Sequence, residues 1–176
     1  MYIGVKTIYR SRLLMSGKND IKRFVFNDLI VEFETSELKD MVRKSLALSR
    51  NETGGIITGR YSSDRKKAIV KTFYGPTIDS KGTQFSFVRG KKGLSELLCK
   101  LWITNEYYLG EWHLHPLSSP NASSIDIEQM LKISQDNNYK CPEPILIIVG
   151  GAIDSLKYNA YVVIQRKVNL MTEIDL

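Results

Sequence analysis

The sequence predicts an α/β domain in which helices pack against one mixed β-sheet. Segments typical of strands and of helices alternate along the chain, and one pair of neighbouring strands is separated only by a short charged turn. Hydrophobic residues make up 43% of the 176 residues, which is enough for one globular domain with its own core. No internal repeat or low-complexity segment interrupts this pattern.

The first 50 residues are expected to contain a basic arm, one strand and one helix. Residues 1–26 are rich in lysine and arginine, so we interpret them as an arm or an added edge element and residues 27–176 as the domain. Residues 29–34 (LIVEFE) have the β-branched and aromatic content of a strand. The helix predicted over residues 35–50 has Ser36 as its candidate N-cap. Its apolar residues recur at helical spacing: Leu38, Met41, Val42, Leu46 and Leu48.

The middle of the chain is expected to supply a hairpin, a short strand and a helix. Residues 54–61 and 67–75 are strand-like and are joined by the charged turn SSDRK, which predicts the hairpin. Residues 83–90 (TQFSFVRG) are a further short strand. Residues 91–108 have the apolar periodicity of an amphipathic helix.

The C-terminal part is expected to contain three strands and a helix. Residues 109–116 (LGEWHLHP) form a strand that ends at its proline. Residues 123–138 form a helix, and the continuous apolar run within residues 144–151 predicts a buried strand. Residues 157–168 alternate between apolar and polar side chains and are expected to be the last strand.

The composition excludes several classes of protein. The longest apolar run, residues 145–149, is far too short to span a bilayer, and no apolar stretch follows the basic start as in a signal peptide. The two cysteines, Cys99 and Cys141, form no CxxC pair and are expected to be buried as small apolar side chains. We therefore expect a soluble, cytoplasmic protein that does not bind a membrane.

The net charge of +6 is unevenly distributed. Residues 1–100 carry the positive charge, whereas residues 101–176, which contain both histidines, are acidic overall. A basic surface attracts nucleic acid. The chain contains no nucleic-acid-binding motif, however, and a solvated basic face explains the same charge. Nucleic acid is therefore not an expected partner.

Both histidines of the chain lie two residues apart in the predicted strand 109–116. Side chains alternate along a strand, so His113 and His115 share one face with Glu111, while Trp112 and Leu114 point into the core. Two imidazoles on a rigid strand suit a divalent transition metal, most commonly zinc. A catalytic zinc site also needs a third protein ligand and an open position.

Asp126 is the candidate third ligand. It lies in the first turn of the predicted helix, after a turn-rich loop that can bring the chain back to the histidines. Glu128 lies about 200° further around that helix, so both carboxylates cannot face the histidines. An alternative needs no metal, since Ser123 followed by Asp126 is also an ordinary helix N-terminus.

These residues resemble the JAMM metalloproteases, also called the MPN+ family. His113, His115, Ser123 and Asp126 match the family signature H-x-H-x(7)-S-x-x-D, and Glu52 in the segment NETGGIITG matches the family's upstream glutamate. The resemblance covers about residues 28–165. It implies an MPN domain, a mixed sheet sandwiched by helices with a cytidine-deaminase-like architecture, and zinc held by His113, His115 and Asp126.

The resemblance is strongest to prokaryotic members. The small size and the GEWH sequence are similar to stand-alone deconjugating peptidases encoded beside ubiquitin-activating and ubiquitin-conjugating-like enzymes, as in the CBASS antiphage operons. Such a member is expected to work with those enzymes and with a nucleotidyltransferase of the same operon. One departure is Leu114, because the family usually has Ser or Thr between the histidines. This residue faces away from the metal, so we expect a difference in packing.

The family chemistry implied here is hydrolysis of a peptide or isopeptide bond. Glu52 would accept and return a proton, and the Ser123 hydroxyl would stabilise the oxyanion. The implied substrate is a ubiquitin-like or conjugated protein with a small-residue C-terminal tail, usually glycine. Residues 82–92 are a candidate edge for that tail, with Arg89, Lys91 and Lys92 available to an acidic partner.

Three questions stay open at this point. Glu111 shares a face with the histidines and competes with Glu52 for the proton-transfer role, although we favour Glu52 and interpret Glu111 as a residue behind the ligands or on the surface. The same chemistry serves a peptidase that trims a sulfur-carrier protein. A non-catalytic MPN scaffold is the third alternative, but such domains generally lack the histidine and aspartate residues kept here.

Overall fold

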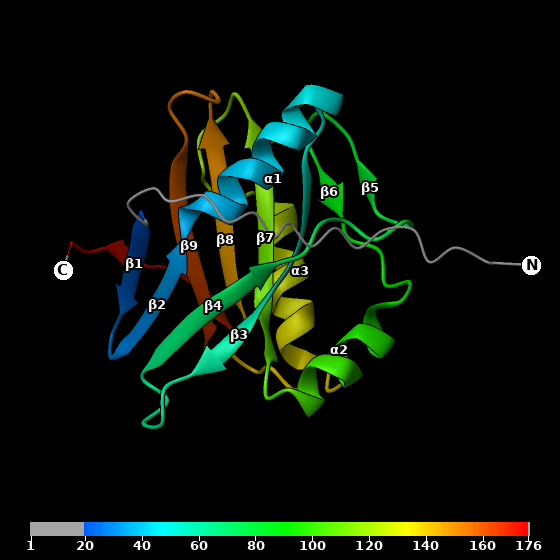
Figure 1. Ribbon diagram of the computed structural model, residues 1–176. Helices are drawn as coiled ribbons and strands as arrows, with labels where there is room; N and C mark the ends of the chain where they lie inside the picture. The colour runs from blue at the N-terminus through cyan, green and yellow to red at the C-terminus, as the bar shows by residue number, and fades with distance from the viewer. Residues whose placement is uncertain (1–19, 176) are drawn as a thin grey trace, which may run out of the picture.

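The computed structural model describes residues 20–175, and most of the expected basic arm, residues 1–19, lies outside them. A large mixed sheet forms the body of the molecule, with three helices around it (Figure 1). The strands are β1 (Ile21–Phe26), β2 (Leu29–Glu34), β3 (Thr53–Tyr61), β4 (Lys67–Phe73), β5 (Lys81–Gly82), β6 (Phe87–Val88), β7 (Tyr107–Pro116), β8 (Ile145–Gly151), β9 (Lys157–Ile164), β10 (Lys167–Leu170) and β11 (Thr172–Glu173). The helices are α1 (Thr35–Leu48), α2 (Leu94–Ile103) and α3 (Ser124–Gln135).

The order of strands places β7 near the middle of the sheet. Nine strands run in the order β10-β9-β8-β7-β3-β4-β2-β1-β11, and β5 and β6 form a separate two-stranded hairpin. β7 is parallel to β8 and antiparallel to β3, and β2 is parallel to β4, so the predicted mixed sheet is confirmed. β1, which falls within the expected arm, pairs with β2 and β11 in this same sheet.

Helices cover both faces of the sheet, as predicted. On one face, the buried residues of α1 pack with Trp112 and Leu114 of β7. On the other face, Met130 and Ile133 of α3 and Leu94 of α2 pack against β8. The same alternation that sends Trp112 and Leu114 to the α1 side therefore sends the histidines to the α3 side.

The start and end of α1 differ from the prediction. Ser36 is not the N-cap, because Thr35 already begins the helix directly after β2 and Glu34 occupies the cap position without a side-chain cap bond. The Thr35 hydroxyl instead donates to Asp20 Oδ2 at 3.1 Å, which anchors this junction. Leu48 was expected on the buried face but is 88% exposed, because it is the last residue of α1 and lies beyond the core.

Three other boundaries predicted from the sequence are wrong. Residues 83–90 are not one strand, because the Thr83 backbone N–H bonds to Ser86 O and turns the chain into the β5–β6 hairpin. α2 ends at Ile103 and residues 107–108 already belong to β7. Residues 157–168 split into β9 and β10 at a turn where Gln165 and Arg166 have φ values of 50° and 59°.

Two further elements agree with the prediction, whereas α3 ends at Gln135 instead of residue 138 and β11 was not predicted. β3 and β4 form the predicted antiparallel hairpin, and β8 is a buried strand. Cys141 is buried as expected, but Cys99 is exposed, because it lies on a face of α2 that does not contact the sheet. Within residues 20–175, every helix is too short or too polar to cross a membrane.

Candidate metal centre

The histidines are held on a central strand of the sheet. β7 is hydrogen-bonded on both sides, and His113 lies between Gly54 of β3 and Ile148 of β8 in the register. Both imidazoles are buried, with relative exposures of 0% for His113 and 5% for His115. Trp112 on the opposite face is fixed by its indole N–H, which donates to Tyr74 O at 2.8 Å. The backbone therefore leaves the two histidines little freedom to move apart.

Gly54 allows β3 to approach the site. A Cβ atom at this position would lie 2.3 Å from Trp112 O and 2.8 Å from His113 Cδ2, both far inside contact distance. Phe87 of β6 then packs edge-on against the His113 ring, with 5.3 Å between centroids. The β5–β6 hairpin thus forms one wall beside the histidines.

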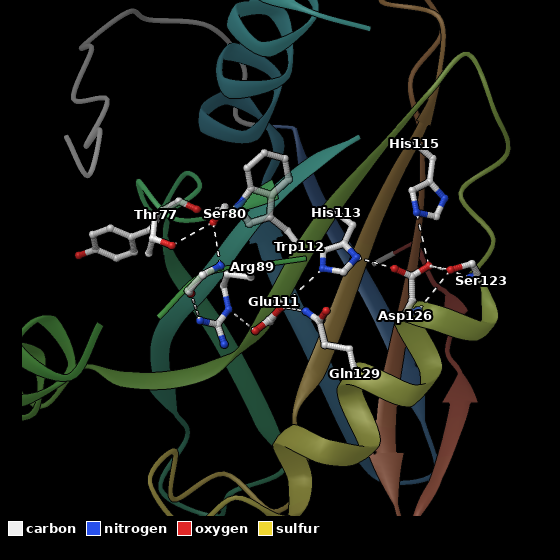
Figure 2. Close-up of polar contacts among 12 residues, drawn as sticks. Thr77, Ser80, Arg89, Glu111, Trp112, His113, His115, Ser123, Asp126 and Gln129 are labelled. Carbon is white, nitrogen blue, oxygen red and sulfur yellow. Dashed lines mark hydrogen bonds and ion pairs between the residues drawn. The ribbon is translucent and has the colours of Figure 1, made fainter. Parts of the chain in front are cut away.

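The chain returns to the histidines at the N-terminus of α3. Ser123 is the N-cap, and it forms a reciprocal capping box with Asp126. Asp126 Oδ2 accepts from the Ser123 backbone N–H at 2.7 Å, while Asp126 Oδ1 lies 2.6 Å from His113 Nδ1 (Figure 2). The helix-cap interpretation and the ligand interpretation of the sequence are therefore compatible, because one carboxylate serves both contacts.

The three predicted ligands form one buried cluster. Their candidate ligand atoms lie within 4.8 Å of one another. His115 Nε2 lies 3.5 Å from Asp126 Oδ2 and has no hydrogen-bond partner among residues 20–175, while His113 directs its Nδ1 to the same carboxylate. Buried polar atoms are rarely left unpaired, because each costs roughly 1–3 kcal/mol. Two imidazole nitrogens that face one carboxylate in this way, His113 Nδ1 and His115 Nε2, fit a divalent metal ion.

The electrostatics of the cluster keep its carboxylate ionised. Burial alone would raise the pKa of Asp126, but its contacts with His113 and His115 hold that pKa well below its usual value. Burial would lower the pKa of His113, whereas its contacts with Asp126 and Glu111 raise it to about 9. An ionised carboxylate is the form that binds metal.

Glu52 lies directly before Thr53, the first residue of β3. Thr53 pairs with Leu114, which lies between the two histidines on β7. Its backbone N–H donates to Thr83 O at 2.7 Å and ties it to the β5–β6 hairpin. Burial is the main cause that raises the pKa of the Glu52 carboxyl. The charges of His115 and His113 act to lower that pKa, and the charge of Asp126 acts to raise it. Two segments that are distant in sequence therefore meet at the cluster.

Glu111 is not a surface residue. It is completely buried and accepts hydrogen bonds from Arg89, Tyr108 and Gln129. Burial would raise the pKa of Glu111, but His113 and Arg89 keep that pKa below its usual value. Arg89 is only 8% exposed. The expectation that it is available to an acidic partner is therefore wrong. Nothing local in the sequence indicates this pairing, because Arg89 and Glu111 are 22 residues apart.

Comparison with known proteins identifies the class. Residues 34–164 match the family of prokaryotic homologues of the JAB domain. The chain belongs to this family, which confirms the resemblance to the JAMM proteins drawn from the motif.

Two curated relatives share the name CD-NTase/cGAS isopeptidase. The protein from Enterobacter hormaechei subsp. hoffmannii (strain UCI 50) is 40% identical over 121 residues, covering 69% of this chain and 67% of that protein. The protein from Pseudomonas aeruginosa (strain BWHPSA011 / Pa011) is 27% identical over 128 residues, covering 70% of this chain and 79% of that protein. The expected similarity to deconjugating peptidases is thus confirmed.

The fold is also shared with a solved structure. A protein from Desulfitobacterium hafniense, determined in solution, superposes with a TM-score of 0.59 at 15% identity, covering 80% of this chain and 88% of that protein. This likeness concerns the fold alone.

Proposed function

We propose that this protein is a zinc-dependent isopeptidase that cuts after the C-terminal tail of a ubiquitin-like or conjugated protein. The observation that carries the proposal is the buried cluster of His113, His115 and Asp126 in a member of the JAB family, in which His115 Nε2 has no hydrogen-bond partner among residues 20–175. The name shared by the two relatives supports a CD-NTase, a nucleotidyltransferase, as the conjugated protein.

Each role is assigned to a residue of this chain. His113, His115 and Asp126 would hold the zinc, which when bound supplies Lewis-acid activation of water and of the scissile carbonyl. Glu52, arriving from a different strand, would accept the proton of the water and return it to the departing amine. No covalent intermediate is needed, so neither cysteine takes part.

Ser123 is assigned to the oxyanion. Its hydroxyl has one proton, which it donates to Asp126 Oδ2 at 2.6 Å, while its oxygen accepts from the Asp126 backbone N–H. Stabilising an oxyanion therefore requires the hydroxyl to turn away from Asp126 toward the substrate. The backbone capping bond from Ser123 N to Asp126 holds the helix end while this happens.

Ser123→Ala is expected to slow hydrolysis much more than it weakens the fold. Losing one oxyanion donor typically costs about 10²–10³-fold in rate, whereas losing an N-cap side chain costs about 1 kcal/mol of stability. Turnover and thermal unfolding are measured on the same preparation, with Ser124→Ala as a control because Ser124 is the exposed neighbour. A Ser123→Ala variant as active as the parent contradicts the assignment.

The β5–β6 hairpin is the proposed docking edge for the substrate tail. An extended peptide can add as a further strand to an open edge, with main-chain hydrogen bonds giving affinity. This two-stranded hairpin is outside the main sheet, and its Phe87 contacts His113. Phe85 and Val88 of the same hairpin are exposed, at 83% and 55%, and offer apolar contact to a protein substrate.

A narrow tail site predicts a preference for glycine before the scissile bond. A fusion of a glycine-ended tail to a reporter is expected to be cleaved, and replacement of the terminal glycine by Trp is expected to reduce the rate strongly, because Phe87 and β3 crowd the histidines. Rates are compared by gel densitometry with and without a zinc chelator. Equal rates for glycine and Trp would argue against this tail site.

The sulfur-carrier alternative differs in the bond that is cut. A carrier-processing peptidase cuts only a linear peptide, whereas an isopeptidase also releases a lysine side chain. Parallel assays on a linear fusion and on a lysine-linked conjugate of the same tail separate the two functions. The relatives' name favours the isopeptide bond.

A further inference from the structure

We propose that Glu111 is a positioning residue that holds the ring of His113, and that Arg89 and Gln129 fix Glu111 in place for this purpose. The inference rests on the proposed metal centre and adds to it a buried support that the sequence motif does not include. Figure 2 shows the chain of contacts, which runs from Arg89 through Glu111 to His113 and on to Asp126.

His113 lies between two carboxylates. Asp126 Oδ1 is 2.6 Å from one ring nitrogen, Nδ1, and Glu111 Oε2 is 3.5 Å from the other, Nε2. A metal-binding histidine usually directs its second nitrogen to a carboxylate or carbonyl, which fixes the tautomer and the orientation of the ring. Because Nδ1 faces Asp126, the other proposed ligand, Nε2 is the second nitrogen of His113, and Glu111 is the carboxylate that faces it.

Both carboxylate oxygens of Glu111 are held by hydrogen bonds. Its Oε1 accepts from Arg89 Nε and from the Tyr108 hydroxyl, and its Oε2 accepts from Gln129 Nε2 at 2.6 Å. Arg89 is anchored in turn by the Tyr139 hydroxyl at 2.6 Å and by Gly90 O at 2.7 Å. These bonds hold the carboxylate beside His113.

A purely structural role explains this pair poorly. The side chains of Arg89 and Glu111 are 3% and 0% exposed, and the desolvation of such a buried ion pair commonly offsets its attraction. Apolar residues of similar volume would often serve stability as well. Together with Gln129 of α3, the pair joins the end of β6 to the centre of β7, beside the cluster. A role in holding a ligand accounts for that location.

The test compares zinc affinity in three variants and one control. Glu111→Gln keeps the shape of the side chain, the double variant Arg89→Met with Glu111→Gln leaves no buried charge unpaired, and Gln129→Leu removes only the amide that holds Glu111 Oε2. Glu32→Gln is the matched control, since Glu32 forms an ion pair with Arg23 at 2.7 Å between β1 and β2, away from the site. The zinc Kd is measured by competition with a chelator, and folding by circular dichroism and thermal unfolding.

Glu111→Gln and the double variant are expected to bind zinc about 10–100-fold more weakly than the parent. Gln129→Leu should change the Kd in the same direction by a smaller factor, and Glu32→Gln should not change it. The absorption bands of bound Co²⁺ should shift in the Glu111 variants and not in the control, because the ligand field depends on ring orientation.

A folded double variant that binds zinc as the parent does overturns the inference. If the double variant does not fold, Gln129→Leu decides: a weaker zinc affinity supports the inference, and an unchanged affinity overturns it. A parent protein that binds no zinc overturns the proposed metal centre itself, and the inference falls with it. A zinc-binding parent with unchanged variants overturns only the role of Glu111.

Discussion

Replacing His115 or Asp126 by alanine is expected to remove most of the bound zinc and, with it, hydrolysis. The parent protein should carry about one zinc ion per chain, since the cluster offers the three protein ligands of a catalytic site. Loss of one ligand leaves two, which is too few to retain the ion through purification. Elemental analysis of the purified variants measures the effect, and zinc supplied during expression prevents an accidental loss.

A matched control separates the ligand role from loss of charge on α3. Glu128 is an exposed carboxylate on the same helix, paired with Lys132, so Glu128→Ala should keep its zinc. Asp126→Ala also removes the capping box and should cost about 1 kcal/mol of stability. His115→Ala leaves the cap intact, so a common loss of zinc in both variants cannot come from the cap. Full zinc content in His115→Ala would contradict the ligand assignment.

Glu52→Gln is expected to lose about 10²–10⁴-fold in hydrolysis rate while it keeps its zinc. The amide preserves size and hydrogen bonding but cannot accept the proton. Glu52 approaches the cluster from the start of β3, whereas Glu111 is completely buried and fully occupied by Arg89, Tyr108 and Gln129. Glu111 therefore has no access to a water molecule that reacts with substrate.

Turnover and zinc content of Glu52→Gln and Glu111→Gln are best measured side by side. Glu111→Gln should cost less, through weaker zinc binding, and excess zinc should restore part of its rate. Excess zinc should not restore Glu52→Gln. An inactive, zinc-loaded Glu111→Gln beside a normal Glu52→Gln would show that the roles are reversed.

The sequence predicts the fold best where side-chain period and burial agree. Residues 111–115 alternate between polar and apolar side chains, and this part of β7 has the predicted faces because a strand in the centre of a sheet must bury both. Prediction fails where tertiary contacts set a boundary. Thr35 begins α1 because β2 runs straight into the helix, and the β9–β10 turn contains Gln165 and Arg166, which are not typical turn residues.

The residues of the candidate site also differ in how well the sequence predicts them. His113, His115 and Asp126 are visible in the sequence because their spacing is local, and the structure brings them together as predicted. Arg89 and Gln129 are not visible, because each is 18 or more residues from Glu111 and nothing local marks the pairing. The proximity of Glu52 follows from the pairing of β3 with β7, which only the family resemblance could supply beforehand.

The most direct measurement of the central claim uses a conjugate in which a glycine-ended protein tail is joined to a lysine side chain of a second protein. The zinc-loaded protein is expected to release the intact tail protein with a free glycine carboxylate and the second protein with an unmodified lysine, both identified by intact mass. Chelation should stop this release, and added zinc should restore it. A conjugate that stays intact with zinc-loaded protein, or release that continues undiminished in Glu52→Gln and in His115→Ala, would contradict the account.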